Sequence, residues 1–160
     1  MDFAQARKVM VDSQVRVNDV TSSEVVGAFS TIPRETFVPK GMRASAYAEL
    51  EIETSEARAM WLPRDLGKLL VGLEPVASDV SLVIGAGAGY SAALLGYMTE
   101  AVIALEDDEA LVDTMAERFA AIGMDEAVAV QGDLSAGLPD QGPFDIVFIA
   151  GMVEAVPHPW

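Results

Sequence analysis

Three closely spaced glycines form the first candidate site: Gly85, Gly87 and Gly89 lie in the segment LVIGAGAGYSA at residues 82–92. An apolar run precedes them and small residues that can begin a helix follow, which predicts a strand, a tight turn and a helix. Backbone N–H groups at such a junction can reach a ligand, and side chains at the glycine positions would block its approach. We therefore expect residues 85–89, including Ala86, to hold a ligand, with a ligand-free turn as the alternative.

Acidic residues follow the next two apolar runs. Glu106 comes about 20 residues after Gly85, the position at which a carboxylate accepts the hydroxyl groups of a ribose. Asp107 follows it, and the alternative for both residues is capping of the next helix. Asp133 ends the tripeptide QGD before Leu134 and is expected in the crevice outside the strand ends, with a plain turn as the alternative.

The spacing of the glycines separates two cofactor classes that both carry a ribose. A dinucleotide fingerprint is G-x-G-x-x-G, whereas this loop has a glycine at every second position. The tighter pattern is similar to the glycine motif of class I methyltransferases, in which the loop approaches the methionine part of S-adenosylmethionine. The sulfonium is a cation, which suits a chain with a formal charge of −15.

Composition excludes several classes of function. The chain has 160 residues, no cysteine and a single histidine, His158, so disulfides, thiolate metal sites and a histidine-based triad are excluded and no metal is expected. The strongly negative charge argues against binding to a nucleic-acid backbone. No apolar run could span a bilayer and residues 1–10 lack a secretory signal, which indicates a cytoplasmic protein.

The amino-terminal half has the spacing of amphipathic helices. Thr21 and Glu24 fit a capping box, and Pro63 fits the first turn of a helix. The expected helices cover residues 3–17, 22–32, 42–48 and 63–73, with a turn and an extended piece at 33–39 and irregular or extended chain at 50–62.

From residue 79 the pattern changes to alternating strands and helices. The expected strands are 79–84, 101–106, 127–131 and 144–150, and the expected helices are 89–98 and 108–122. Such alternation predicts an open α/β parallel sheet of Rossmann-like type with helices on both faces. We expect a single domain over 1–160, comprising a helical elaboration at 1–75, a cofactor-binding core at 76–151 and a tail at 152–160.

Seven segments make the chain resemble protein-L-isoaspartate O-methyltransferases, class I enzymes that use S-adenosylmethionine. The resemblance covers residues 7–151, and its most distinctive part is PRETFVP. The segments are MVDSQV (10–15), VVGAFSTIPRETFVP (25–39), AYAELEI (46–52), IGAGAGY (84–90), ALE (104–106), QGD (131–133) and GPFDIVFIAG (142–151). The resemblance implies methyl transfer to the side-group carboxylate of an isoaspartyl protein, which requires alignment of the reactants rather than acid or base chemistry.

The chain departs from the family pattern in three places. A Thr-Ile-Ser segment of the family corresponds to Ala59, Met60 and Trp61, so that an indole replaces the serine at the substrate site. Val83 replaces the acidic residue that usually lies two positions before the first glycine. The family's C-terminal strands are missing, so we expect a minimal version of the fold, a truncated form of the chain, or a partner that covers an exposed sheet edge.

These departures leave the function open among four hypotheses. The first is an O-methyltransferase with a protein or peptide carboxylate as acceptor, in which Trp61 is either a core anchor or a wall of the acceptor pocket. Arg64 could pair with that acceptor or could simply lie in a solvated first helical turn, and no catalytic residue is assigned. The alternatives are a non-catalytic cofactor-binding module or a methyltransferase with another acceptor, and then an NAD-dependent oxidoreductase.

Overall fold

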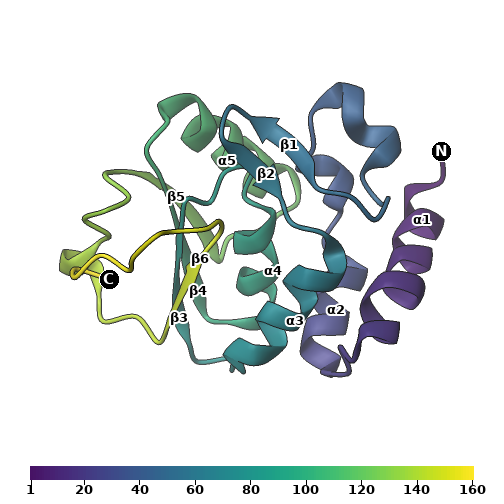
Figure 1. The fold of residues 1–160 in the computed structure, drawn as a ribbon, viewed down its shortest axis with the longest axis horizontal. Coiled ribbons are helices and arrows are strands. Elements are labelled where there is room, and N and C mark those ends of the chain that lie inside the picture. Colours follow the sequence, from purple (N-terminus) through teal and green to yellow (C-terminus); the bar gives the residue numbers. More distant parts are fainter.

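The computed structural model describes residues 1–160, which form a four-stranded parallel sheet with helices packed against it (Figure 1). The strand order is β5-β4-β3-β6, so the first strand of the core, β3, lies between β4 and β6. Each strand coincides with a mainly apolar run of the sequence, because both faces of such a sheet are covered. The strands are β3 (Val80–Ile84), β4 (Ala101–Glu106), β5 (Ala127–Gln131) and β6 (Ile146–Ile149).

The two core helices lie on the same side of the sheet. α4 (Tyr90–Met98) follows β3, and α5 (Glu109–Ala121) follows β4. Both contribute to the main hydrophobic cluster, and Figure 1 shows them on the side that faces the amino-terminal helices. A smaller cluster of Leu82, Ile84 and Leu105 occupies the other side.

No core helix covers that other side, which corrects the prediction of helices on both faces. The segment between β5 and β6 contains only a short helical turn, Pro139–Gln141, instead of a crossover helix. Leu134, Leu138, Phe144 and Trp160 pack on the smaller cluster in its place. A loop and the carboxyl-terminal tail therefore cover this face.

The amino-terminal helices pack beside α4 and enlarge the core. α1 (Phe3–Met10) continues through a π-helical turn, Val11–Val15, and a short 3-10 turn, Arg16–Asn18, so the predicted helix at 3–17 is present with a change of hydrogen-bond pattern. α2 (Ser23–Thr31) contacts α4, and α3 (Pro63–Leu73) contacts α2 and the π-helical turn. Pro63 is at the start of α3, as predicted.

Two local predictions in this half were wrong. Ser22, not Thr21, caps α2, because its hydroxyl accepts the Val25 N–H at 3.3 Å. The expected helix at 42–48 is a 3-10 turn at Lys40–Ser45.

Residues 50–62 form an antiparallel hairpin, of which the sequence predicted only an extended or irregular segment. β1 (Ile52–Ser55) pairs with β2 (Arg58–Met60) through a turn in which Ala57 has a φ of 58°. In Figure 1 the hairpin lies at the top of the molecule, above α3 and α4. The hairpin places Arg58 at the start of β2 and leads directly into Trp61 and α3.

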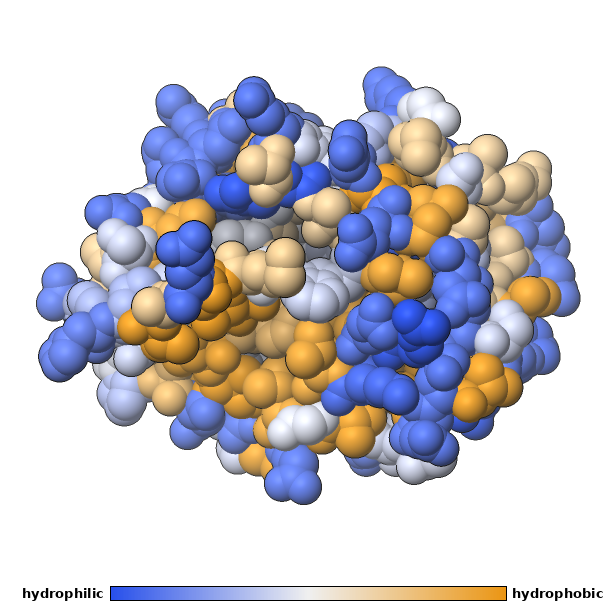
Figure 2. All heavy atoms as spheres, viewed as in Figure 1, coloured by the Kyte–Doolittle hydropathy of each residue, from blue (hydrophilic) through white to orange (hydrophobic).

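The sheet has two open edges, at β5 and at β6. Figure 2 shows apolar side chains gathered across the middle and lower part of one face, where β6 lies, and hydrophilic side chains along the top. No helix of the chain combines the length and the apolar character needed to cross a membrane.

Candidate cofactor and acceptor site

The glycine loop connects β3 to α4 at the carboxyl ends of the strands. Gly85 has a φ of 67° and Gly89 a φ of 92°, a region that residues with a Cβ rarely adopt. A Cβ at Gly89 would lie 2.7 Å from Met115 Cγ, whereas a Cβ at Gly85 would meet only Leu134 Cδ1, at 3.9 Å. Gly89 is thus required for packing of the loop on α5, and Gly85 faces space that a ligand can use.

The N–H groups of the loop are largely satisfied within the protein. Those of Gly85 and Ala86 donate to the Leu105 carbonyl at 3.0 and 3.1 Å, and that of Gly89 donates to the Ala86 carbonyl at 2.9 Å. The Gly87 N–H donates to Glu106 Oε2 at 2.8 Å. These four N–H groups therefore bond within the protein, and a loop with so few free donors is poorly suited to a phosphate.

Glu106 lies at the end of β4 directly beside this loop and has no exposed surface. Its Oε1 accepts the Asp107 N–H at 2.9 Å, and its Oε2 accepts the Gly87 N–H. Arg58 donates to both oxygens, from Nη2 to Oε1 at 2.7 Å and from Nε to Oε2 at 3.0 Å. Burial opposes ionisation of Glu106, but these hydrogen bonds from Arg58, Asp107 and Gly87 outweigh it and lower the pKa to about 2.

Asp108 caps α5, so the helix-capping alternative for Glu106 and Asp107 was wrong. The Asp108 carboxylate accepts the Ala110 N–H at 2.8 Å and the Leu111 N–H at 3.4 Å. Asp107 is instead exposed and binds Arg58 Nη2 at 3.0 Å. The neighbouring Glu106 carboxylate raises the pKa of Asp107.

Asp133 forms a local turn in this structure. Its Oδ1 accepts the N–H of Ser135 at 2.8 Å and the Ser135 hydroxyl at 2.7 Å. These bonds lower the pKa of Asp133. The side chain is exposed and does not line the groove at the ends of β3 and β6, whereas Leu134 does.

A groove of about 340 Å³ runs along the carboxyl ends of β3 and β6. It lies between the hairpin turn, the glycine loop and the tail, and Arg58, Gly85 and Leu134 line three of its sides. Apolar residues dominate the remaining lining, including Ile84, Ile149, Ala150 and Trp160. The Trp160 indole donates to the Leu134 carbonyl at 2.8 Å, which holds the tail against the loop after β5.

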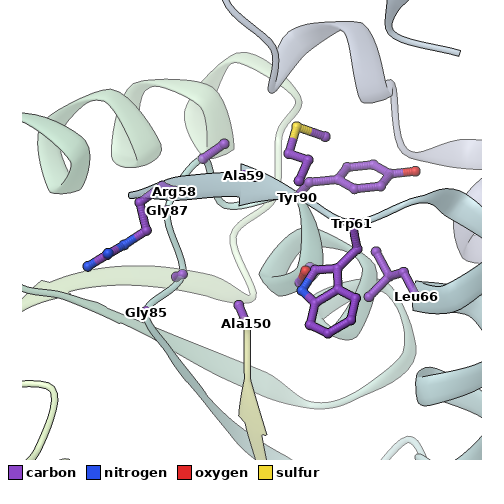
Figure 3. Close-up of a pocket in the computed structure, with 12 residues that line it drawn as sticks. Arg58, Ala59, Trp61, Leu66, Gly85, Gly87, Tyr90 and Ala150 are labelled. Atoms are coloured by element: carbon purple, nitrogen blue, oxygen red, sulfur yellow. The ribbon is translucent and has the colours of Figure 1, made fainter. Parts of the chain in front are cut away.

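A narrow cavity of about 20 Å³ lies next to this groove, behind the hairpin (Figure 3). Gly85, Arg58 and Ala150 line both spaces, so the two are contiguous. Trp61 and Tyr90 form the far wall in Figure 3, with Leu66 beside the indole. Trp61 is partly exposed, packs on the core and lines this cavity.

Arg34, which the sequence analysis did not select, fixes this wall from behind. It has no exposed surface, and its Nε donates to the Ala46 carbonyl at 2.8 Å while its Nη2 donates to the Trp61 carbonyl at 2.9 Å. Its guanidinium carbon lies 4.9 Å from the centre of the Tyr90 ring, a cation–π contact. Arg34 thereby ties the proline-bounded segment to the hairpin exit and to the first residue of α4.

Two further predicted positions lie outside the cavities. Arg64 pairs with Asp65 at 2.9 Å and with Glu49 at 3.5 Å, which fits the solvated first turn better than a role in the acceptor pocket. Val83 is fully buried within β3 and belongs to the core. No group of three or more His, Cys, Asp or Glu side chains has an arrangement that could hold a metal ion.

The model of one protein family matches residues 5–160, namely Protein-L-isoaspartate(D-aspartate) O-methyltransferase. The chain belongs to the protein-L-isoaspartate O-methyltransferase family. The resemblance seen in the sequence motifs is thus confirmed, and S-adenosylmethionine is the methyl donor that this family uses.

Individual relatives agree with this assignment. The chain is 32% identical to the protein-L-isoaspartate O-methyltransferase of Roseiflexus castenholzii over 159 residues, which are 99% of this chain and 72% of that protein. It is 32% identical to the enzyme of Koribacter versatilis, covering 97% of this chain and 70% of that protein. A solved protein-L-isoaspartate O-methyltransferase superposes with a TM-score of 0.85 at 23% identity, over 96% of this chain and 50% of that one. The class I methyltransferase fold of the family is therefore confirmed.

Proposed function

We propose that the chain binds S-adenosylmethionine in the groove and transfers its methyl group to a carboxylate of a protein or peptide, as members of this family do. The observation that carries the proposal is the pairing of two features at the ends of β3 and β4. One is a buried carboxylate, Glu106, and the other is a glycine loop whose N–H groups are mostly used internally. This combination suits a neutral ribose and a cationic sulfonium better than a pyrophosphate.

The residues present fit that cofactor. Glu106 would hold the ribose hydroxyls, Gly85 leaves room for the methionine part, and Leu134 offers an apolar contact for the adenine. The remaining cofactor residues of the proposal surround these positions: Ala86, Gly87, Gly89, Asp107 and Asp133. Asp133 would have to exchange its hydrogen bonds with Ser135 for hydrogen bonds with the cofactor in order to contribute to binding.

When bound, S-adenosylmethionine supplies a methyl group that an ionised carboxylate accepts without any proton transfer. The chain therefore needs no general base, and its contribution is to bind, to orient and to exclude water. The narrow cavity in Figure 3 lies where an acceptor could approach, between the glycine loop and Trp61. No side chain there carries a charge that would move a proton, apart from the already paired Arg58.

Trp61 limits which acceptors fit. Its indole forms part of the cavity wall at the position that corresponds to the family's serine. We infer that an acceptor enters only if it packs against the indole. This requirement restricts the acceptors to carboxylates on narrow side chains or with apolar neighbouring residues. The cytosol is the compartment we assign to this activity, and the overall charge of −15 disfavours a nucleic-acid partner.

Titration calorimetry followed by a transfer assay tests the proposal. We expect S-adenosylmethionine and S-adenosylhomocysteine to bind and NAD not to bind. Transfer of labelled methyl to an isoaspartyl peptide is then compared with the same peptide containing normal aspartate. Failure of both sulfur compounds to bind would refute the proposal, whereas binding without methyl transfer to either peptide would support the non-catalytic module or a methyltransferase with a different acceptor.

A Trp61→Ser variant tests the acceptor side separately. Arg34 binds the carbonyl of residue 61, not its side chain, so this change opens the cavity wall without releasing the backbone. We expect faster transfer to the isoaspartyl peptide and unchanged affinity for S-adenosylhomocysteine. The matched control is Trp160→Ser, which removes the other indole, from the tail, and should not increase the rate. Equal rates for the wild type and Trp61→Ser would show that the indole does not restrict the acceptor.

A further inference from the structure

Arg58 occupies the carboxylate to which the cofactor's ribose would bind. Its guanidinium donates in a bidentate manner to both oxygens of Glu106, at 2.7 and 3.0 Å. The same Nη2 also donates to Asp107 Oδ1 at 3.0 Å. Bidentate pairs of this kind are among the stronger side-chain contacts in proteins, and this one lies on a carboxylate with no exposed surface.

Each Glu106 oxygen already has two donors. Oε1 accepts from Asp107 N–H and Arg58 Nη2, and Oε2 accepts from Gly87 N–H and Arg58 Nε. The two backbone donors belong to the glycine loop and to the end of β4, which are fixed by the sheet. A ribose with two hydroxyl groups can therefore reach Glu106 only by replacing the two N–H groups of Arg58.

We propose that Arg58 is an affinity-determining residue that closes the ribose subsite on Glu106 and leaves it when a nucleoside with a free 2′,3′-diol binds. The proposal rests on the cofactor site put forward under the proposed function. The subsite is thus closed in the free protein and opens only for a ligand that can satisfy both carboxylate oxygens.

The position of Arg58 makes such an exchange possible. It lies at the first residue of β2, directly after the hairpin turn, and its side chain keeps 22% of its surface exposed. An isolated two-stranded hairpin is held weakly compared with a strand inside a sheet. In this structure β1 and β2 pair only with each other.

Asp107 gives the displaced guanidinium a second partner. Its carboxylate is 57% exposed and already contacts Arg58, so the arginine can leave Glu106 without losing every ionic contact. The exchange would leave Glu106 bound to the diol and to its two backbone donors. Arg58 would then lie over Asp107 at the mouth of the groove, which it already lines.

Closing the subsite reduces the apparent affinity for the cofactor. If only a fraction of molecules has the carboxylate free, the apparent dissociation constant is larger than the intrinsic one by the inverse of that fraction. Removal of the guanidinium should therefore tighten binding, by on the order of tenfold if the open form is about one tenth of the population. A residue that merely contacts the cofactor would have the opposite effect when it is removed.

Calorimetry with S-adenosylhomocysteine tests this directly on the wild type, Arg58→Gln and a control, Arg16→Gln. Arg16 is an exposed residue after α1 that pairs with Asp12 at 3.6 Å, so the control removes the same charge far from the groove. We expect about tenfold tighter binding for Arg58→Gln and no change for Arg16→Gln. Weaker or equal binding of Arg58→Gln, with the wild type still binding, would overturn this proposal and leave the proposed function intact.

A spectroscopic measurement follows the arginine itself. In a ¹⁵N spectrum the Arg58 Nε–H signal, assigned by its loss in Arg58→Gln, should be slow to exchange with water in the free protein. Saturation with S-adenosylhomocysteine should shift it and speed up its exchange. An unchanged signal in a saturated sample would overturn the proposal, and absence of binding in every variant would refute the proposed function together with it.

Discussion

Ionisation of Glu106 links the stability of the fold to pH. The pKa of this carboxyl is about 2 in the folded chain, below its ordinary value of 4.5. The stabilisation is therefore fully present above about pH 4.5 and is lost as the pH falls through the folded pKa. Since Arg58 provides two of the four hydrogen bonds to this carboxylate, protonation also weakens the hold of the glycine loop on the hairpin.

Urea unfolding of the wild type and of Glu106→Gln at several pH values measures this contribution. We expect the wild type to lose about 2 kcal/mol of unfolding free energy relative to the variant between pH 5 and pH 2. Glu126→Gln, which changes an exposed acid, is the control and should follow the wild type. Parallel pH profiles for the wild type and Glu106→Gln would contradict the depressed pKa.

Alanine substitutions at two glycines of the loop are expected to have different effects, one mainly on stability and the other mainly on cofactor binding. Gly89→Ala places a Cβ 2.7 Å from Met115 and 3.2 Å from Phe119, so we expect a loss of about 3 kcal/mol in the free energy of unfolding. Gly85→Ala has open space in front of it and should cost only about 1 kcal/mol for the left-handed backbone. Its larger effect should be weaker binding of S-adenosylhomocysteine, measured by calorimetry. A Gly89→Ala protein as stable as the wild type would contradict the packing role of Gly89. A Gly85→Ala protein with normal affinity would contradict the role of Gly85 at the cofactor site.

Arg34 acts between elements instead of within one. From the segment before the 3-10 turn at Lys40–Ser45, it contacts Ala46 directly after that turn, the exit of the hairpin and the first residue of α4. Because it is a buried cation bonded only to carbonyls and an aromatic ring, its replacement removes several contacts at once.

Arg34→Lys is expected to lower the free energy of unfolding by about 2 to 4 kcal/mol, since an ammonium group does not reproduce the planar fork that reaches both carbonyls. Chemical denaturation measures the loss, with the exposed Arg43→Lys as the matched control. Trp61 fluorescence should shift to longer wavelength in Arg34→Lys as the hairpin exit loosens. A loss below about 1 kcal/mol would mean that the two carbonyl bonds are replaced easily.

The elements differ in how well the sequence predicted them. The four core strands are apolar runs and were predicted within one or two residues, because burial on both faces leaves a strong pattern. The hairpin was not, since only Ile52 and Met60 are buried in it and its turn at Glu56 and Ala57 contains no glycine. The connection from β5 to β6 also differed from the prediction. There a loop with apolar side chains, in place of a helix, covers the face of the sheet.

In the candidate site, the residues that are close together in the sequence were predicted and those that are distant in the sequence were not. The glycine loop and Glu106 lie in one strand-turn-helix unit and the next strand, so their spacing along the chain located them. Arg58 reaches Glu106 across 48 positions of sequence, and nothing near it predicts that contact. Arg34 was missed for a similar reason, although the proline-bounded segment around it was the most distinctive part of the resemblance.

On the scale of the whole molecule, the open edge at β6 and the net charge act in opposite directions. β6 pairs with β3 on one side only, and Val147 on it is 38% exposed. An unpaired edge with apolar side chains favours pairing with another chain. A charge of −15 opposes such pairing through repulsion, which salt screens.

We therefore expect self-association that increases with protein concentration and with salt, measured by sedimentation velocity at low and high ionic strength. Val147→Lys should reduce it by placing a charge on the β6 edge. Val128→Lys on β5, the other open edge, is the comparison: Val128 is 55% exposed, so the variant that reduces association more identifies the edge that pairs. A wild type that stays monomeric at every salt concentration would contradict this expectation, and the β6 edge would then need no partner.

The bond from Arg34 to the carbonyl of Trp61 has a consequence for how this site can change. Arg34 binds the backbone carbonyl of position 61, a group that every amino acid has whatever its side chain. This hydrogen bond therefore does not restrict which side chain occupies the position. Substitution at this one position can alter the shape of the acceptor cavity while the surrounding scaffold stays in place. Position 61 is thus a natural point for the divergence of acceptor preference within an otherwise unchanged framework, and a library of replacements there would measure how far that divergence can extend.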